Sequence, residues 1–339
     1  MNRIVIIGNG FDLAHGLKTS YRDFINDFWE QEKEKVIADC NVYPNPNTCF
    51  IHKYDCENYA IAIDAPTTIN DATNRYGYDW FKFVGNHLNG KLIVKNTILR
   101  FISETMYQNW VDIEETYYRE LCNCLRGSRL DGIKQLNKEF TVIKKALEHY
   151  LNNIPKIFSK KVFQYFDKAI TVDEKPISDV LFLNFNYTRT INHYVTRDDS
   201  VIHIHGDLED PDNPIIFGYG DEMDEHSKEI ENTKNNEYLQ YMKTIEYLRN
   251  SHYKQLRTFI EADKYEILIV GHSCGISDRT LLNKLFEDKH CHRIKIFYHK
   301  REDGTDNFNN ILYNIYRIFN DKNTMRDMVV SKEESIPLL

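Results

Sequence analysis

Glycine and proline are scarce in this sequence, with 14 and 8 residues of 339. Their scarcity excludes a collagen-like chain and a low-complexity tract, and it makes any cluster of glycines informative. The hydrophobic fraction is 42% and the charged fraction is 28%, which is the composition of an ordinary globular protein. The length corresponds to one large domain or to two smaller ones.

Long apolar runs and paired cysteines are also missing. No run approaches the roughly 18 to 20 apolar residues that cross a membrane, and the run at residues 4–7 is too short for a secretory leader. The seven cysteines are irregularly spaced and include no CxxC pair, which is typical of reduced thiols and argues against a structural zinc site. We therefore expect a cytoplasmic protein without membrane attachment and without bound metal.

Basic residues are fewer than acidic ones: the sequence has 43 Lys and Arg and 51 Asp and Glu, which gives a net charge of -8. The protein as a whole therefore has no basic field that would hold nucleic acid. A local basic patch is still compatible with this balance.

Short β-branched runs alternate with helical segments along much of the chain. Such a run, when it ends in glycine or polar residues, is typical of a strand that is buried on both faces of a sheet. The predicted strands are residues 4–7, 180–183, 201–204, 215–217, 267–270 and 294–298, and the predicted helices include residues 20–35, 226–263 and a segment that begins near Ser277 and Asp278. This alternation predicts an α/β fold with a mainly parallel, doubly wound sheet.

Two segments interrupt the alternation. Residues 40–78 are rich in Asn, Pro, Asp and Thr without a clear period, which predicts an irregular loop. Residues 79–168 have a mostly helical pattern and no comparable strand signal. We therefore predict a discontinuous, Rossmann-like nucleotide-binding domain of residues 1–30 and 175–325, with residues 40–168 as a loop and helical insertion.

Compact polar or glycine-rich motifs follow four of the apolar runs. They are Gly8-Asn9-Gly10, Asn186-Tyr187-Thr188, His205-Gly206 and Gly271-His272-Ser273. The carboxyl ends of parallel strands line one edge of a sheet, and ligands bind there at the point where the strand order reverses. The four motifs therefore predict one shared site.

Each motif also has a purely structural interpretation. The turn Gly8-x-Gly10 lets the backbone approach a diphosphate, but it is also typical of a tight turn, and Leu13 stands where GxGxxG requires its third glycine. Asn186 is suited to orienting a water or a ribose hydroxyl, or simply to capping a helix. His205 is suited to general base catalysis, or to a structural role in the core.

Residues 271–275 also satisfy the G-x-S-x-G pattern of a nucleophile elbow, with Ser273 as the nucleophile. The acid and the histidine of such a hydrolase follow the serine, each on a later strand. The rest of the chain has one convincing strand and offers His299 with Asp278 or Asp288, which is a cramped set. A serine hydrolase is therefore the weaker alternative.

Five motifs, in order, resemble the bacteriophage abortive-infection AbiH family. They are Gly8-Asn9-Gly10-Phe11-Asp12-Leu13-Ala14-His15-Gly16-Leu17 with Thr19, Tyr21, Asp23 and Phe24, then Trp110-Val111-Asp112-Ile113-Glu114, Phe185-Asn186-Tyr187-Thr188, His203-Ile204-His205-Gly206, and Gly271-His272-Ser273 with Asp278. The resemblance spans nearly the whole chain apart from residues 40–78. It implies an antiviral defence protein.

A more distant resemblance links the chain to sirtuin-like NAD-binding domains. Gly8, Gly10 and Gly16 fall at the spacing of the pattern GAGxSxxxGI. The pattern T-x-N-[YI]-D is similar to the residues around Asn186, and a histidine before a glycine is similar to His205. Two positions depart from the patterns, because Asp12 replaces the Ser and Thr188 replaces the Asp. These departures, with the absence of a zinc module, count against protein deacetylation more than against NAD binding.

Together the resemblances imply a hydrolase that uses NAD as substrate or ligand and cleaves the nicotinamide–ribose bond without a metal. His205 and Asn186 are the implied catalytic residues. The implied nucleotide-binding residues are Gly8, Asn9, Gly10, Phe11, Asp12, Gly16, Tyr187, Thr188, Gly271, His272, Ser273 and Asp278.

Other readings stay open. The chain is alternatively a nucleotide-binding sensor without catalysis, which Thr188 in place of Asp favours. Its helical segment is also suited to recognising a phage component. Expected partners are a nucleotide, a phage-encoded trigger or second defence protein, and further copies of the chain.

Overall fold

The computed structural model describes residues 1–40, 53–62, 75–87, 91–104, 110–129, 132–171, 176–195, 200–220 and 226–338. The chain divides into two compact units. One unit contains residues 1–19 and 154–339, and the other contains residues 20–153. The first unit is therefore discontinuous in sequence.

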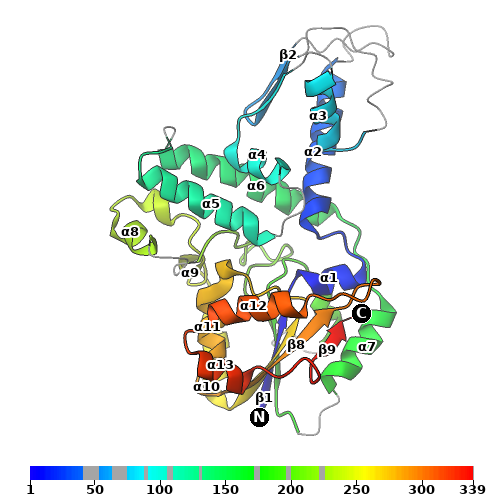
Figure 1. Cartoon of the computed structure of the whole chain (residues 1–339), viewed down its shortest axis with the longest axis vertical. Helices are drawn as coiled ribbons and strands as arrows, with labels where there is room; N and C mark the ends of the chain where they lie inside the picture. Colours follow the sequence, from blue (N-terminus) through cyan, green and yellow to red (C-terminus); the bar gives the residue numbers. More distant parts are fainter. Residues whose placement is uncertain are drawn as a thin grey trace. The chain divides into compact units, whose positions relative to one another are not determined.

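A six-stranded sheet forms the centre of the first unit (Figure 1). Its strands are β1 (Asn2–Ile7), β5 (Val180–Asn184), β6 (Val201–His203), β7 (Tyr265–Val270), β8 (Cys291–His299) and β9 (Ile336–Leu338). They lie in the order β6-β5-β1-β7-β8-β9, and every pair of neighbours is parallel. The predicted mainly parallel α/β sheet is thus confirmed, including the pairing of β1 with strands from far along the chain.

The strand order reverses at β1. From β1 the chain adds β5 and then β6 on one side, and it returns to add β7, β8 and β9 on the other side. All six strands point the same way, so the segments that follow β1, β5, β6 and β7 leave the sheet at one edge. This edge is where the predicted motifs begin.

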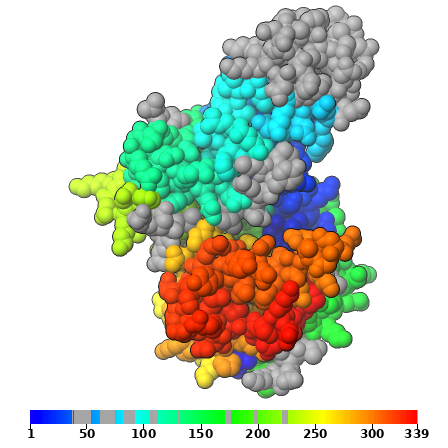
Figure 2. All heavy atoms as spheres, viewed as in Figure 1, coloured from blue at the N-terminus to red at the C-terminus, as the bar shows by residue number. Residues whose placement is uncertain are grey.

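The sheet is buried on both faces, as the continuous apolar runs predict. Ile4 and Ile6 of β1 belong to a core cluster on one face, and Val5 and Ile7 belong to a cluster on the other. On the first face pack α10 (His252–Ala262), α11 (Arg279–Phe286), α12 (Phe308–Ile318) and α13 (Lys322–Met328). Figures 1 and 2 show α12 and α13 on the surface of this face. On the second face pack α1 (Asn9–His15) and α7 (Lys160–Thr171).

The second unit is mostly helical, but it also contains a small sheet. Its helices are α2 (Tyr21–Cys40), α3 (Tyr78–His87), α4 (Thr97–Glu104), α5 (Trp110–Leu125) and α6 (Gly132–Asn153), and its strands are β2 (Lys53–Asp55), β3 (Tyr59–Ala62) and β4 (Lys91–Val94). The strands pair antiparallel in the order β2-β3-β4. The prediction of an irregular loop and of a helical segment without strands is wrong at these positions. The strands are three or four residues long, which is too short for a period to stand out.

Three further elements differ from the sequence prediction. Residues 215–217 form no strand, and Ile216 N–H instead donates to the carbonyl of His205. The predicted helix at 226–263 is interrupted, and it divides into α8 (Ser227–Asn232), η4 (Asn236–Leu239), α9 (Lys243–Glu246) and α10. Strand β9 was not predicted. None of the helices in the described ranges is both long enough and apolar enough to cross a bilayer.

Candidate functional site

The turn after β1 packs directly on the turn after β7. Gly8 N–H donates to Val270 O (3.0 Å), and Gly10 N–H donates to Gly271 O (2.8 Å). A Cβ on Gly10 would lie 2.8 Å from Gly271 Cα, and Gly271 itself has a φ of +68°. The two backbones approach so closely that neither glycine tolerates a side chain without movement. Both glycines therefore have a packing role, whatever they do toward a ligand.

Asn186 ties the end of β5 to the same turn. Its side-chain Nδ2 donates to Gly8 O (3.1 Å), and its backbone N–H donates to Asn184 Oδ1 (3.1 Å). The side chain is buried beneath the edge of the sheet. The predicted partners Gly8 and Asn186, which are 178 positions apart, are thus in direct contact.

Asp12 is a buried carboxyl beside this contact. Thr188 Oγ1 donates to its Oδ2 (2.5 Å), while its Oδ1 has no hydrogen-bond partner among the described residues. Burial raises the pKa of Asp12 from 3.8 to about 6, although Thr188, Thr190 and Asn186 lower it in part. The ionised form of this carboxyl is therefore costly in the folded protein.

A second buried carboxyl, Asp278, binds three basic side chains. Its Oδ1 lies 2.7 Å from Lys243 Nζ and 3.2 Å from His205 Nε2, and its Oδ2 lies 3.5 Å from His272 Nε2. Tyr247 Oη lies 3.0 Å from the same His205 nitrogen. Lys243 is 1% exposed and Asp278 is 7% exposed. This His205–Asp278 cluster, with Lys243, His272 and Tyr247, joins the loops after β6 and β7 to α9.

The charge of Asp278 is stabilised by these neighbours. Burial alone would raise the pKa of Asp278, but Lys243, His205 and His272 together hold it well below its usual range. Asp278 is therefore a carboxylate at neutral pH. A carboxylate in this position orients the histidines that contact it.

The backbone determines the tautomer of His272. Cys274 N–H donates to His272 Nδ1 (3.0 Å), so the proton of neutral His272 lies on Nε2 and faces Asp278. Cys274 has a φ of 54° and is, among the described residues, the one non-glycine in the left-handed region. That conformation costs about 1 to 3 kcal/mol. Strain of this kind is typical of sites where the backbone must hold a side chain in one orientation.

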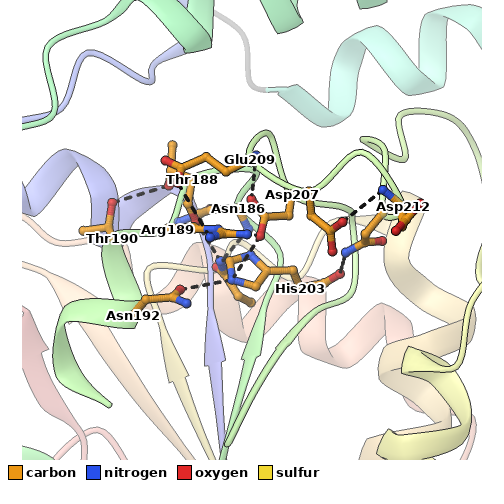
Figure 3. Close-up of polar contacts among 12 residues, drawn as sticks. Asn186, Thr188, Arg189, Thr190, Asn192, His203, Asp207, Glu209 and Asp212 are labelled. Atoms are coloured by element: carbon orange, nitrogen blue, oxygen red, sulfur yellow. Dashed lines mark hydrogen bonds and ion pairs between the residues drawn. The ribbon is translucent and has the colours of Figure 1, made fainter. Parts of the chain in front are cut away.

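A third polar network joins the loops after β5 and β6 (Figure 3). Arg189 Nε donates to Asp207 Oδ2 (2.7 Å), and the guanidinium also lies 3.6 Å from Glu209. His203 Nε2 lies 3.1 Å from Asn192 Oδ1 and 4.0 Å from Asp207 Oδ2. Burial lowers the pKa of His203, which is consistent with a neutral, structural histidine. The network holds the two loops that carry the predicted catalytic residues.

Other predicted site residues have structural contacts. Phe11 lies in the core, with its ring edge-on to Phe166 (5.0 Å), and Gly16 ends α1 in the left-handed conformation at a φ of 89°. Asn9 is the first residue of α1. Tyr187 Oη donates to Ile216 O (3.1 Å).

Ser273 lacks the partner that a nucleophile needs. The serine is exposed, and within the described residues its hydroxyl makes no hydrogen bond to a histidine. Its neighbour His272 uses one ring nitrogen toward Cys274 N–H and the other toward Asp278. Nucleophilic catalysis requires a base beside the hydroxyl, so the local geometry does not favour the serine hydrolase.

Sequence reasoning missed Lys243, Tyr247, Arg189 and Asp207. Lys243 and Tyr247 lie in a polar segment in which no spacing or motif marks them. They reach the cluster only because α9 folds back toward the edge of the sheet. A signal existed for Arg189 and Asp207, since each closely follows a predicted motif.

A family model described as bacteriophage abortive infection AbiH matches residues 4–300. The four strand-end motifs and Asp278 all lie within the matched residues. No curated protein and no solved structure matches the chain.

Proposed function

This chain belongs to the bacteriophage abortive infection AbiH family, and we propose that it acts by binding and cleaving NAD at the carboxyl edge of its six-stranded sheet. The observation that carries the proposal is the contact of 3.2 Å between His205 Nε2 and the buried carboxylate of Asp278 at that edge. A histidine that is oriented by a buried carboxylate is suited to general base catalysis. NAD is the substrate in this proposal, and no metal takes part.

The strand order supports a nucleotide ligand. Numbered along the chain within this sheet alone, the order β6-β5-β1-β7-β8-β9 is 3-2-1-4-5-6, which is the order of Rossmann dinucleotide-binding sheets. In such sheets the ligand binds where the order reverses, next to the first strand. The glycine turn, Asn186 and His272 all follow strands at or beside this point. We therefore assign the chain a Rossmann-like, sirtuin-like fold as part of the proposal.

The proposed reaction is hydrolysis of the bond between nicotinamide and ribose. The bond from ribose C1′ to the nicotinamide nitrogen breaks, and its electron pair leaves with nicotinamide. The oxygen of water bonds to C1′, and the proton of the water passes to His205. Because His205 Nε2 faces Asp278 and Tyr247, Nδ1 is the nitrogen that receives this proton. Such a base typically contributes about 100- to 10,000-fold to the rate.

The remaining residues of the cluster position this base. Asp278 stabilises the protonated form of His205 as the proton arrives, in the way that a buried aspartate supports a catalytic histidine. Lys243 keeps Asp278 ionised by direct contact. Asn186, which is held by Gly8 O, aligns the nicotinamide ribose with the water.

Nicotinamide release from NAD by the purified protein tests the proposal. The variants His205→Ala and Asn186→Ala should each lose most of the turnover, and the double variant should be little slower than the slower single one, because the residues act together. His292→Ala is the matched control, since His292 is exposed at the start of β8. We expect it to keep the wild-type rate.

Two readouts separate catalysis from folding. Circular dichroism should show that each variant stays folded, and plaque assays should show that each loses protection against phage. A folded His205→Ala protein that cleaves NAD at the wild-type rate would end the assignment of His205. A wild-type protein that binds NAD without releasing nicotinamide, during phage challenge as well as at rest, would favour the sensor.

A further inference from the structure

The two departures from the sirtuin-like pattern lie opposite each other in the fold. Asp12 stands where the pattern has Ser, and Thr188 stands where it has Asp. The structure joins these two positions by a hydrogen bond, from Thr188 Oγ1 to Asp12 Oδ2 at 2.5 Å. Relative to the sirtuin-like pattern, the carboxyl has therefore moved from position 188 to position 12, and the hydroxyl has moved from position 12 to position 188. The two side chains at this contact are still one carboxyl and one hydroxyl.

One carboxylate oxygen of Asp12 accepts no hydrogen bond from the described residues. Asp12 is 1% exposed, and its Oδ1 has no hydrogen-bond partner among the described residues. A buried acceptor without a donor is costly. The side chain of Asn186 lies close to Asp12 and lowers its pKa, but the hydrogen bond that its Nδ2 makes is to Gly8 O in the adjacent turn. A bound molecule with a hydroxyl group would supply the missing donor.

We propose that Asp12 Oδ1 accepts a hydrogen bond from a ribose hydroxyl of the bound nucleotide, while Thr188 holds the carboxyl through Oδ2. This inference rests on the proposed function. A diphosphate has only acceptor oxygens and would be repelled by the carboxylate. The ribose hydroxyls are the favoured donors, because the side chain of Asn186, which the proposed function places at the nicotinamide ribose, lies beside Asp12. The exchange also removes the argument for a silent sensor, since the carboxyl is relocated and not lost.

A swap of the two side chains tests the inference. The variants are Asp12→Ser, Thr188→Asp and the double variant, which restores the order of the sirtuin-like pattern. Asp327→Ser is the matched control, because Asp327 is exposed on α13. Binding of NAD and of ADP-ribose is measured by calorimetry, protection against phage by plaque assay, and folding by circular dichroism.

Asp12→Ser should weaken binding of both nucleotides about 10- to 100-fold, which is the usual contribution of a hydrogen bond to a charged group. The double variant should recover most of this loss, while the control should bind normally. A purely structural role for Asp12 would change the stability of the variants but would not produce rescue of affinity. The isosteric variant Asp12→Asn adds a pH profile, since wild-type affinity should fall when Asp12 is protonated and the affinity of the variant should not.

Three other results of the binding measurements would contradict part of this account. A folded Asp12→Ser protein that binds both nucleotides as tightly as the wild type would overturn the inference. Weakening for NAD alone would assign the contact to the nicotinamide group and would overturn the ribose assignment. A wild-type protein that binds neither nucleotide would overturn the proposed function instead. The plaque assay would then decide separately whether the carboxyl is needed, by loss in Asp12→Ser and rescue in the double variant.

Discussion

Replacement of Asp12 by Asn should stabilise the first unit, relative to the wild type, increasingly as the pH rises from about 4 to about 7. Burial raises the pKa of Asp12 from 3.8 to about 6 in the folded protein. Between these values the folded protein holds a proton that the unfolded chain has already released. The contribution of Asp12 to stability is therefore complete below about pH 4, and it is lost as the pH rises through about 6.

The size of this effect follows from the two pKa values. Each tenfold difference in proton affinity corresponds to about 1.4 kcal/mol, so the free energy of unfolding should fall by about 3 kcal/mol across this range. Asn at this position does not titrate. The difference in free energy of unfolding between Asp12→Asn and the wild type should therefore grow by about 3 kcal/mol and level off above about pH 7. An amide in place of Oδ1 adds a constant cost, which does not alter the slope.

Urea unfolding from about pH 4 to about pH 8, followed by far-ultraviolet circular dichroism, measures this difference. Tryptophan emission is unsuitable, because Trp29, Trp80 and Trp110 all lie in the unit of residues 20–153. Asp327→Asn is the matched control on the exposed face of α13, and its curve should run parallel to the wild type. A difference between Asp12→Asn and the wild type that does not change with pH would refute the reasoning. Together with loss of nucleotide binding, the expected result would show a site carboxylate that is kept at the expense of stability.

Three other substitutions test the packing and the charges of the first unit, two of them at the candidate site and one at the amino ends of the strands. Lys243→Met should destabilise the first unit by about 3 to 5 kcal/mol in urea unfolding, because Asp278 loses its nearest cation while buried; the added change Asp278→Asn should recover part of the loss, and no recovery would contradict this account. Gly10→Ala should lower the free energy of unfolding by about 1 to 3 kcal/mol in the same assay, because its Cβ would lie 2.8 Å from Gly271 Cα. A wild-type midpoint of urea unfolding would show that the turns are not in close contact. Glu266→Gln should lower the free energy of unfolding by about 3 to 5 kcal/mol, because the carboxylate of Glu266 pairs with Arg3 of β1 and Arg293 of β8 and is 2% exposed. A decrease below about 1 kcal/mol would mean that this ion pair is solvated.

The sheet and the polar residues at its carboxyl edge could be predicted because their signals are local. A strand that is buried on both faces needs a continuous apolar run, and such runs mark β1, β5 and β7 in the sequence. The glycines and polar residues that follow these runs are therefore predicted to share one edge of the sheet. The contacts between Asn186 and Gly8, and between His205 and Asp278, agree with that assignment.

The rest depended on contacts between distant residues. The strands of the small sheet are too short to have a period, and antiparallel pairing alone defines them. Lys243 has no motif of its own, and it joins the site because α9 brings it to Asp278, 35 positions away. In the sequence, Asp12 and Thr188 are two separate departures from the sirtuin-like pattern, but in the fold one hydrogen bond joins them. Periodicity and turn chemistry act within a few residues, so the local pattern is enough to predict β1, β5 and β7 and the polar residues that follow them. Which side chains share a charge or a proton depends on their separation in space, and that separation follows from the fold of the whole unit.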